Sequence, residues 1–346
     1  EPISHAVTQA LYGTVLENSV TRLERFAACA YAHYLNYGLR LKERQLLEFA
    51  SVDMGNIYHD ALEHFSRRVE KSEYTWFNIP EDVQETFIEE SMDDAIAGCK
   101  NAGAFENVRN RYLTGRMRQT IKRTVWALTT QIQKGKFVPT DFEVSFSRAD
   151  KLDAIRFQLS DEEKMNLLGR IDRVDTYETS DKVYVKIIDY KSGNTSFSLV
   201  NLYHGLQLQL VVYMNAALEL EEKRHPGKKA EPAGIFYYHI QNPIVDGLGN
   251  ETEAEIRNSV LEQLKLNGLV NDDPEIYEAM DSDFAGNSSV IPIGKKTDGK
   301  SGCDYCPYHT VCGFDARMPG YSYHKLEKFD SADEILKRME NEKQEQ

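Results

Sequence analysis

Two short acidic segments constrain the fold of this chain more than any other feature. The first ends at Asp172, and the second follows an apolar run that begins at Val183 and reads as a strand. Side chains alternate between the two faces of a strand, so Asp189 and Lys191 share a face with the apolar Ile187. A buried strand that ends in a carboxylate and an amine needs partners for both charges. The sequence therefore predicts that Asp172, on a neighbouring strand, shares a hard divalent cation with Asp189.

This D…D-x-K pattern is what metal-dependent cleavage of a phosphodiester requires. Two carboxylates hold Mg²⁺ through oxygen, and the metal polarises a phosphoryl oxygen and activates water. Lys191 would orient the attacking water or stabilise charge in the transition state. The structural alternative is a surface salt bridge between Asp189 and Lys191, since D-x-K alone often occurs by chance. The upstream Gly-x-Ile-Asp and the apolar strand favour the catalytic interpretation.

Three helical residues are weaker candidates for the same site. His59 lies in Gly55-Asn-Ile-Tyr-His59 and would add an imidazole ligand, which suits Mn²⁺ better than Mg²⁺. A lone histidine on a helix is more often structural. Gln209 and Tyr213 are four residues apart on one helical face and could hold a phosphate or a water. Without the D-x-K context, a half-buried tyrosine beside solvent would be the better interpretation of that pair.

The cysteines predict a metal or cluster site rather than disulfides. The chain has five cysteines, an odd number, and no secretion signal opens it, which indicates a cytoplasmic protein. Cys303, Cys306 and Cys312 are closely spaced on a predicted loop, and Cys29 is the plausible fourth ligand. Zinc and an iron–sulfur cluster remain equally plausible on spacing alone.

Composition limits how the chain can bind its partners. Its 346 residues are 41% hydrophobic and 28% charged, as in soluble globular proteins, and no apolar run is long enough for a membrane span. The net charge of −14 argues against nucleic-acid binding through overall charge. A basic helix from Arg109 to Arg123 is the best candidate for a local DNA contact. The chain begins at Glu1 rather than Met, so we expect a fragment or a processed product.

The order of the predicted elements indicates one α/β domain with a mixed central sheet flanked by helices. Helices are expected near residues 19–37, 55–70, 80–99, 106–134, 199–222 and 251–266, and from 331 to the end. Strands are expected near 141–147, 155–159, 167–177, 182–190 and 234–239. Residues 294–301 match the phosphate-loop pattern, but no helix follows them to present its N-terminus to a phosphate, so we reject an NTPase.

Taken together, six motifs in order resemble a known family. They are the segment from Ser19 to Cys29, G-x-x-x-H at 55–59, G-R-I-D-R-V-D at 169–175, D-Y-K-S-G at 189–193, Q-L-x-x-Y at 209–213 and the cysteine cluster at 303–312. The chain resembles the RecB-type nucleases of the PD-(D/E)XK superfamily, above all the C-terminal nuclease domains of the AddB family of bacterial helicase–nuclease subunits. Ala30 stands where the family often has proline after the first cysteine.

The resemblance implies a restriction-endonuclease-like core with a helical insertion near residues 75–135. It implies a nuclease domain over residues 1–320 and a charged helical extension over 321–346. A [4Fe–4S] cluster held by Cys29, Cys303, Cys306 and Cys312 would staple the fold. It also implies a set of active-site residues. The implied metal ligands are His59, Asp172, Asp189 and the Tyr190 carbonyl, and the implied catalytic residues are Asp172, Asp189, Lys191, Gln209 and Tyr213.

The implied activity is Mg²⁺- or Mn²⁺-dependent hydrolysis of single-stranded DNA unwound by an AddA-like helicase partner, in double-strand-break resection and recombinational repair. One alternative is a non-catalytic DNA-binding or scaffold module, although the intact D…D-x-K set argues against it. Another is a CRISPR-adaptation-type exonuclease of the same superfamily. The resemblance covers only the family's nuclease part, so we do not carry over its ATPase activity to these residues.

Overall fold

The computed structural model describes residues 4–42, 51–99, 108–146, 152–160, 163–245, 251–284, 288, 290–291, 312, 329 and 331–344. Its helices are α1 (His5–Tyr12), α2 (Val20–Ala28), α3 (Ala30–His33), the π-helical turn η1 (Tyr34–Gly38), α4 (Ser51–Lys71), α5 (Glu81–Gly98), α6 (Val108–Gln133), the 3₁₀ turn η4 (Asp153–Ile155), α7 (Leu199–Tyr203), α8 (Gln209–Arg224), α9 (Glu253–Gln263), α10 (Pro274–Met280) and α12 (Ala332–Gln344). Its strands are β1 (Val15–Ser19), β2 (Val138–Phe146), β3 (Arg156–Gln158), β4 (Lys164–Glu178), β5 (Lys182–Lys191), β6 (Lys229–His239) and β7 (Asn267–Val270).

Within the described residues, the seven strands form one mixed sheet organised around the long strand β4. The first residues of β4 pair in parallel with β1 and antiparallel with β3. Its second half pairs antiparallel with β2 and β5, and β5 then pairs in parallel with β6. The predicted mixed sheet is confirmed, whereas β1 and β7 were not predicted. Both are short, and each depends on a partner strand far away in the sequence.

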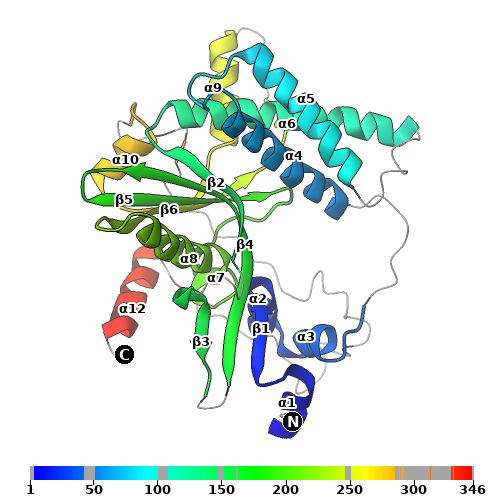
Figure 1. Cartoon of the computed structure of the whole chain (residues 1–346), viewed down its shortest axis with the longest axis vertical. Helices are drawn as coiled ribbons and strands as arrows, with labels where there is room; N and C mark the ends of the chain where they lie inside the picture. Colours follow the sequence, from blue (N-terminus) through cyan, green and yellow to red (C-terminus); the bar gives the residue numbers. More distant parts are fainter. Residues whose placement is uncertain are drawn as a thin grey trace.

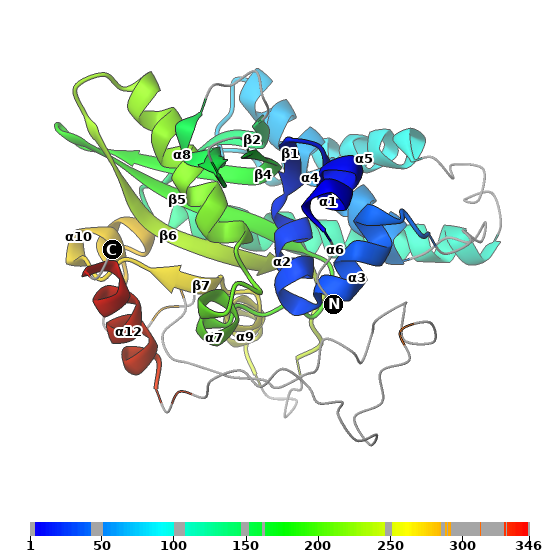
Figure 2. The same cartoon turned by 90° about the horizontal axis from the view of Figure 1, so that it is seen from below.

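Helices cover both faces of the sheet (Figures 1 and 2), and a hydrophobic core lies on each face. On one face, α4, α5 and α6 pack over alternate residues of β5 such as Tyr184 and Ile188. On the other face, α8 packs over Val185 and Ile187. The alternation predicted for β5 is therefore confirmed, and Asp189 lies on the α8 side, where its side chain meets Gln209.

Two predicted helices are each interrupted in the structure, and only the second interruption has a local signal in the sequence. The helix expected over residues 19–37 begins as predicted, with the Ser19 side chain capping it, but it ends before Cys29, whose backbone is extended. The helix expected over 199–222 ends at Tyr203 and restarts at Gln209. Gly205 explains this second break, because its φ of +73° lies in the left-handed region that favours glycine after a helix.

Helices α5 and α6 lie where the helical insertion was predicted, and their charges pair with each other. Arg118 of α6 contacts Glu89 at 2.5 Å and also Asp93, and Lys122 contacts Glu85 at 2.7 Å. Acidic α5 thus pairs with two of the basic side chains on the helix that the sequence offered as a DNA contact. None of the helices in the described part of the chain is both long and apolar enough to cross a membrane.

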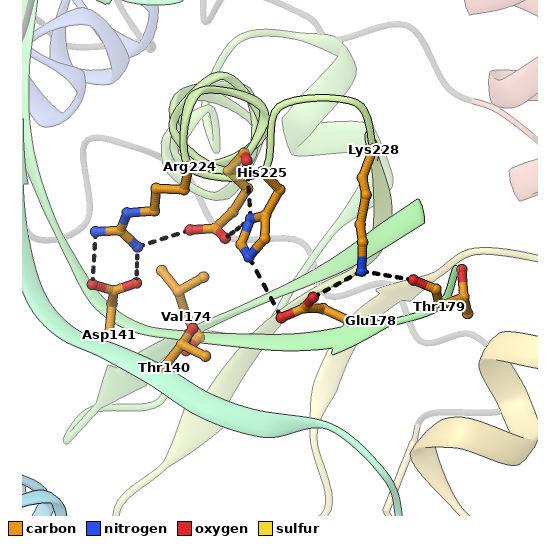
Figure 3. Close-up of polar contacts among 9 residues, drawn as sticks. Thr140, Asp141, Val174, Glu178, Thr179, Arg224, His225 and Lys228 are labelled. Atoms are coloured by element: carbon orange, nitrogen blue, oxygen red, sulfur yellow. Dashed lines mark hydrogen bonds and ion pairs between the residues drawn. The ribbon is translucent and has the colours of Figure 1, made fainter. Parts of the chain in front are cut away.

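A cluster of ion pairs holds the C-terminal end of α8 against the sheet (Figure 3). Arg224 binds Asp141 of β2 through its two terminal nitrogens, Nη1 and Nη2. Its Nη1 also contacts Glu221 at 2.8 Å. His225 lies 3.4 Å from Glu178 at the end of β4. These contacts connect the C-terminal end of α8 to β2 and β4.

Candidate functional site

The sequence-predicted active-site residues meet around one cavity of about 710 Å³ between α4, β4, β5 and the N-terminal end of α8. The structure places all seven of them in its lining: His59, Asp172, Asp189, Tyr190, Lys191, Gln209 and Tyr213. They come from four elements separated by up to 154 positions, so only the fold brings them together.

Strand pairing brings the two predicted carboxylates together. In the antiparallel register of β4 and β5, Arg173 lies opposite Ile188, so the next pair along the strands is Asp172 with Asp189. The backbone N–H of Tyr190 donates to Asp172 Oδ2 at 2.7 Å. Asp172 and Asp189 are both almost fully buried, at 7% and 2% exposed. Their orientation is therefore set by the sheet and not by loops.

Helix α4 brings His59 to these acids by passing close to the end of β5. At Gly55, one turn before His59, a Cβ atom would lie 2.9 Å from Ser192 Oγ, so glycine permits the approach. His59 Nδ1 lies 3.3 Å from Asp172 Oδ2 and 3.9 Å from Glu143 Oε1. Burial alone would lower the pKa of His59, but hydrogen bonds and charges from these two acids outweigh it and raise the pKa to about 10.

Glu143 of β2 is a site residue that the sequence analysis missed. It lies beside His59, and Arg170 Nε contacts its Oε2 at 2.5 Å. Burial raises its pKa, with a further contribution from the charge of Asp172. Its φ of +52° is unusual for a residue other than glycine, and such strain is concentrated at functional sites. The only signal in the sequence was an acid inside a predicted strand.

Gln209 organises the other half of the cavity. Its side-chain amide donates to Asp189 Oδ1 at 2.8 Å and to Tyr213 Oη at 3.1 Å, while its Oε1 accepts from Lys191 Nζ at 3.0 Å. Lys191 Nζ also lies 2.6 Å from Asp189 Oδ2. Burial, followed by repulsion from Asp172, raises the pKa of Asp189 to about 7 despite this ammonium group.

Gly169, the glycine of the G-R-I-D segment, makes room for the aromatic part of this arrangement. A Cβ atom there would collide with the ring of Phe146 and lie 2.9 Å from the ring of Tyr213. The two rings meet edge to face, with centroids 5.5 Å apart. A side chain at position 169 would therefore displace Tyr213 from Gln209, which explains why this motif begins with glycine.

The residues at the cavity fit a divalent cation. Ligand atoms of His59, Glu143 and Asp172 all lie within 4.8 Å of one another. Carboxylate oxygens with one imidazole nitrogen form a donor set that suits Mg²⁺ or Mn²⁺. The negative charges of Glu143 and Asp172 raise the pKa of His59, and the same charges would attract a metal cation.

The structure places only part of the predicted cysteine cluster. Cys29 is exposed at the break between α2 and α3, and its Sγ accepts a hydrogen bond from the N–H of Ala32 at 3.5 Å. Cys312 is half-buried, while Cys303, Cys306 and the phosphate-loop-like residues 294–301 lie outside the described residues. The fifth cysteine, Cys99, is half-buried and also borders the cavity.

Comparison with known proteins agrees with this geometry. The chain is 36% identical to a protein from Lachnoclostridium phytofermentans named as a subunit of an ATP-dependent helicase/deoxyribonuclease, over 94% of this chain and 32% of that protein. It is 32% identical to the proteins of the same name from Thermoanaerobacter sp. (strain X514) and Acetivibrio thermocellus, over 98% and 100% of this chain and 33% and 34% of theirs. The chain thus spans about a third of the length of these relatives.

A match to a known family includes both the acids around His59 and the group around Gln209. The sequence model of the PD-(D/E)XK nuclease superfamily matches residues 17–313, a range that includes every residue of the cavity described above. Nucleases of this superfamily use divalent metals, as the acids around His59 would require. With a mixed sheet that carries paired acids and a lysine at one strand end, the chain belongs to the PD-(D/E)XK nuclease superfamily.

Proposed function

We propose that the chain is a Mg²⁺- or Mn²⁺-dependent deoxyribonuclease that hydrolyses phosphodiester bonds of single-stranded DNA. The observation that supports this most strongly is the meeting of two groups at one cavity. One is the acid and imidazole set that includes His59 and Asp172, and the other is the hydrogen-bonded group of Asp189, Lys191 and Gln209. A site with acids alone would bind cations. The added lysine supplies a positive charge that can stabilise the negatively charged phosphoryl group in the transition state.

Each residue has a role that follows from its chemistry. His59, Asp172, Asp189 and the Tyr190 carbonyl would hold the metal, and Glu143 is a further oxygen donor beside His59 and Asp172. When bound, the metal supplies Lewis acidity toward a phosphoryl oxygen and lowers the pKa of a bound water.

The remaining residues orient and balance charge. Lys191 Nζ places a positive charge where negative charge grows on the phosphoryl oxygens. Gln209 fixes the relative position of Lys191 and Asp189 by accepting from one and donating to the other. Tyr213 supports Gln209 through its hydroxyl group, whose pKa burial raises to about 12, so it remains protonated at neutral pH.

We further propose that a helicase partner delivers the DNA strand, within cytoplasmic double-strand-break resection and recombinational repair. The similar proteins are named as subunits of a helicase/deoxyribonuclease, which supports an AddA-like partner. The charge of the chain supports delivery as well. With a net charge of −14 and Arg118 and Lys122 paired to acids, the described surface offers little general attraction to DNA.

A [4Fe–4S] cluster held by Cys29, Cys303, Cys306 and Cys312 is part of the proposal. The resemblance to the family and the exposed position of Cys29 support it. Protein purified without oxygen should show a broad visible absorption band and about four irons per chain. Zinc in equal amount to the chain and no colour would replace the cluster with a zinc site and leave the nuclease proposal intact.

The activity is tested with end-labelled single-stranded DNA and RNA of the same sequence, each with Mg²⁺ or Mn²⁺ and with EDTA as the control. We expect metal-dependent cleavage of DNA. Preferential cleavage of RNA would contradict the deoxyribonuclease assignment. Tight DNA binding without cleavage of either substrate, with metal present, would instead identify a non-catalytic binding module.

A further inference from the structure

Helix α8 begins without a cap of its own. The residue before its first turn is Leu208, whose side chain cannot accept a hydrogen bond from the free N–H groups there. A carboxylate from a distant part of the chain takes this place. Glu24 of α2, 184 positions earlier than Leu208, accepts from the Leu208 N–H at 2.7 Å and from the Gln209 N–H at 3.0 Å, both through Oε1.

The second of these amides belongs to Gln209, whose side chain holds both Asp189 and Lys191. Fixing the backbone of Gln209 therefore restricts where its side-chain amide can lie. A carboxylate at a helix N-terminus also interacts favourably with the positive end of the helix dipole. Two hydrogen bonds therefore connect Glu24 to Lys191: one from the Gln209 N–H to Glu24, and one from Lys191 Nζ to the Gln209 side chain.

Helix α2 is itself firmly attached on the other side. It follows directly from β1, which pairs with β4 up to Leu168, immediately before the G-R-I-D segment. Its last turn leads to Cys29, whose N–H donates to Arg25 O at 3.0 Å. One helix therefore connects β4, the N-terminus of α8 and the first cysteine of the proposed cluster.

We propose that Glu24 is a positioning residue. It holds the N-terminus of α8 so that Gln209 keeps the side chains of Lys191 and Asp189 in the relative position that cleavage requires. The role rests on the nuclease function proposed above and adds to it a physical connection between the cysteine-bearing helix and the active site. It predicts that disturbing α2 weakens cleavage even though α2 does not line the cavity.

The test compares Glu24→Ala and Glu24→Gln with Glu255→Ala in the full chain. Glu255 is a matched control, because its side chain accepts from the N–H of Thr252 at 2.7 Å in the capping box of α9, away from the cavity. We expect Glu24→Ala to lower kcat by about 10- to 100-fold with little change in KM for a single-stranded oligonucleotide. Glu24→Gln keeps an acceptor oxygen and should recover most of kcat, and Glu255→Ala should leave kcat unchanged.

Combining Glu24→Ala with Gln209→Ala shows whether Glu24 acts through Gln209. If it does, the double variant has nearly the kcat of Gln209→Ala alone, because the two changes remove the same arrangement. Losses that multiply, or an equal loss of kcat in Glu255→Ala, would overturn the proposal and leave a general stability effect.

Amide hydrogen exchange of the first turn of α8 separates this inference from the proposed function, because it needs no activity. We expect faster exchange at Leu208 and Gln209 in Glu24→Ala and near-normal exchange in Glu24→Gln. Unchanged exchange in Glu24→Ala would refute the contact itself. If exchange rises but the wild-type chain cleaves nothing, the nuclease function fails, and Glu24 is then only a structural cap.

Discussion

Strands β4 and β5 carry two clusters of charged side chains that are almost adjacent in sequence and differ in nearly every physical respect. In the first, Arg173 binds Asp175 through two hydrogen bonds of 2.6 Å, and Lys186 Nζ lies 2.8 Å from the same carboxylate. The exposed fractions of these residues are 1%, 0% and 6%. We call this cluster closed, because the Asp175 carboxylate is paired with two buried cationic side chains and is shielded from solvent.

The second cluster, around Asp172 and Asp189, opens onto the cavity. Although burial opposes ionisation of both Asp175 and Asp189, the outcomes are opposite. Charges from Arg173 and Lys186 hold the pKa of Asp175 below its ordinary value, whereas repulsion from Asp172 adds to burial and raises the pKa of Asp189 to about 7. The comparison teaches that the G-R-I-D-R-V-D motif combines a structural charge cluster with an acid, Asp172, that faces the cavity.

The largest effect should come from Asp189→Asn. We expect cleavage to fall by at least about 10²–10³-fold, on the order seen when a charged catalytic group is removed. Folding should be maintained or slightly improved, because the change removes repulsion between two buried acids. Initial cleavage rates and thermal midpoints measure the two effects. Retained cleavage by the pure variant would refute the assignment of Asp189 to the active site.

Asp175→Asn makes the same chemical change in the closed cluster and should have the opposite result. We expect a loss of about 3–5 kcal/mol in the free energy of unfolding, because Arg173 and Lys186 would be left buried without a counter-charge. Urea denaturation followed by circular dichroism measures it, with Asp189→Asn as the matched control. A loss below about 1 kcal/mol would mean that the cluster is less tightly coupled than its geometry indicates.

Adding a divalent metal should stabilise only the open cluster. At about 100 times its Kd, Mg²⁺ or Mn²⁺ is expected to add about 2.7 kcal/mol to the stability of the wild-type chain. Asp172→Asn removes a proposed ligand and should abolish most of the increase. Thermal midpoints measured with and without metal provide the test. An equal increase in both proteins would place the binding elsewhere.

Acid should weaken the closed cluster. The pKa of Asp175 is lower in the folded chain than its unfolded value of about 3.9, so its contribution to stability is fully present above that pH. The contribution is lost as the pH falls below about 4 and through the folded pKa. The unfolding free energy of the wild type should therefore fall more steeply in this range than that of Asp175→Asn, and parallel curves would contradict it.

The smallest effect should come from the ion pairs at the far end of α8. Arg224 and Asp141 are partly exposed, with 42% and 18% of their side chains accessible, so Asp141→Ala, which leaves Arg224 paired with Glu221, should cost about 1 kcal/mol or less. Urea denaturation measures it, and the loss should diminish at high salt. A loss of several kcal/mol would show that this cluster resembles the buried one on β4 and β5.

Much of the fold followed from local patterns in the sequence, and the parts that did not depend on distant pairing. Alternation along β5 predicted which residues share a face with Asp189, and antiparallel pairing predicted that Asp172 would lie near it. Glu143 was missed because its place depends on the register of β2 against β4 and on a left-handed backbone. The roles of the residues around the cavity stay predictions until they are measured.

The contact between Glu24 and α8 could not have been predicted from spacing either. It joins residues 184 positions apart, and no local pattern distinguishes Glu24 from the other acids near it. The interruption at Cys29 was missed for a related reason, since nothing in the sequence around it is a typical helix breaker. Positions of this kind become visible only when the partner segments are placed together.

The left-handed backbone of Glu143 has an evolutionary consequence. A residue with a Cβ atom costs about 1–2 kcal/mol in that conformation, and glycine would relieve the cost. A change from glutamate to glycine would relieve this backbone strain, but it would also remove the ion pair with Arg170 and leave the cavity with one carboxylate fewer. A lineage that keeps glutamate at this position therefore keeps the acid at the cavity despite a backbone conformation that suits glycine better.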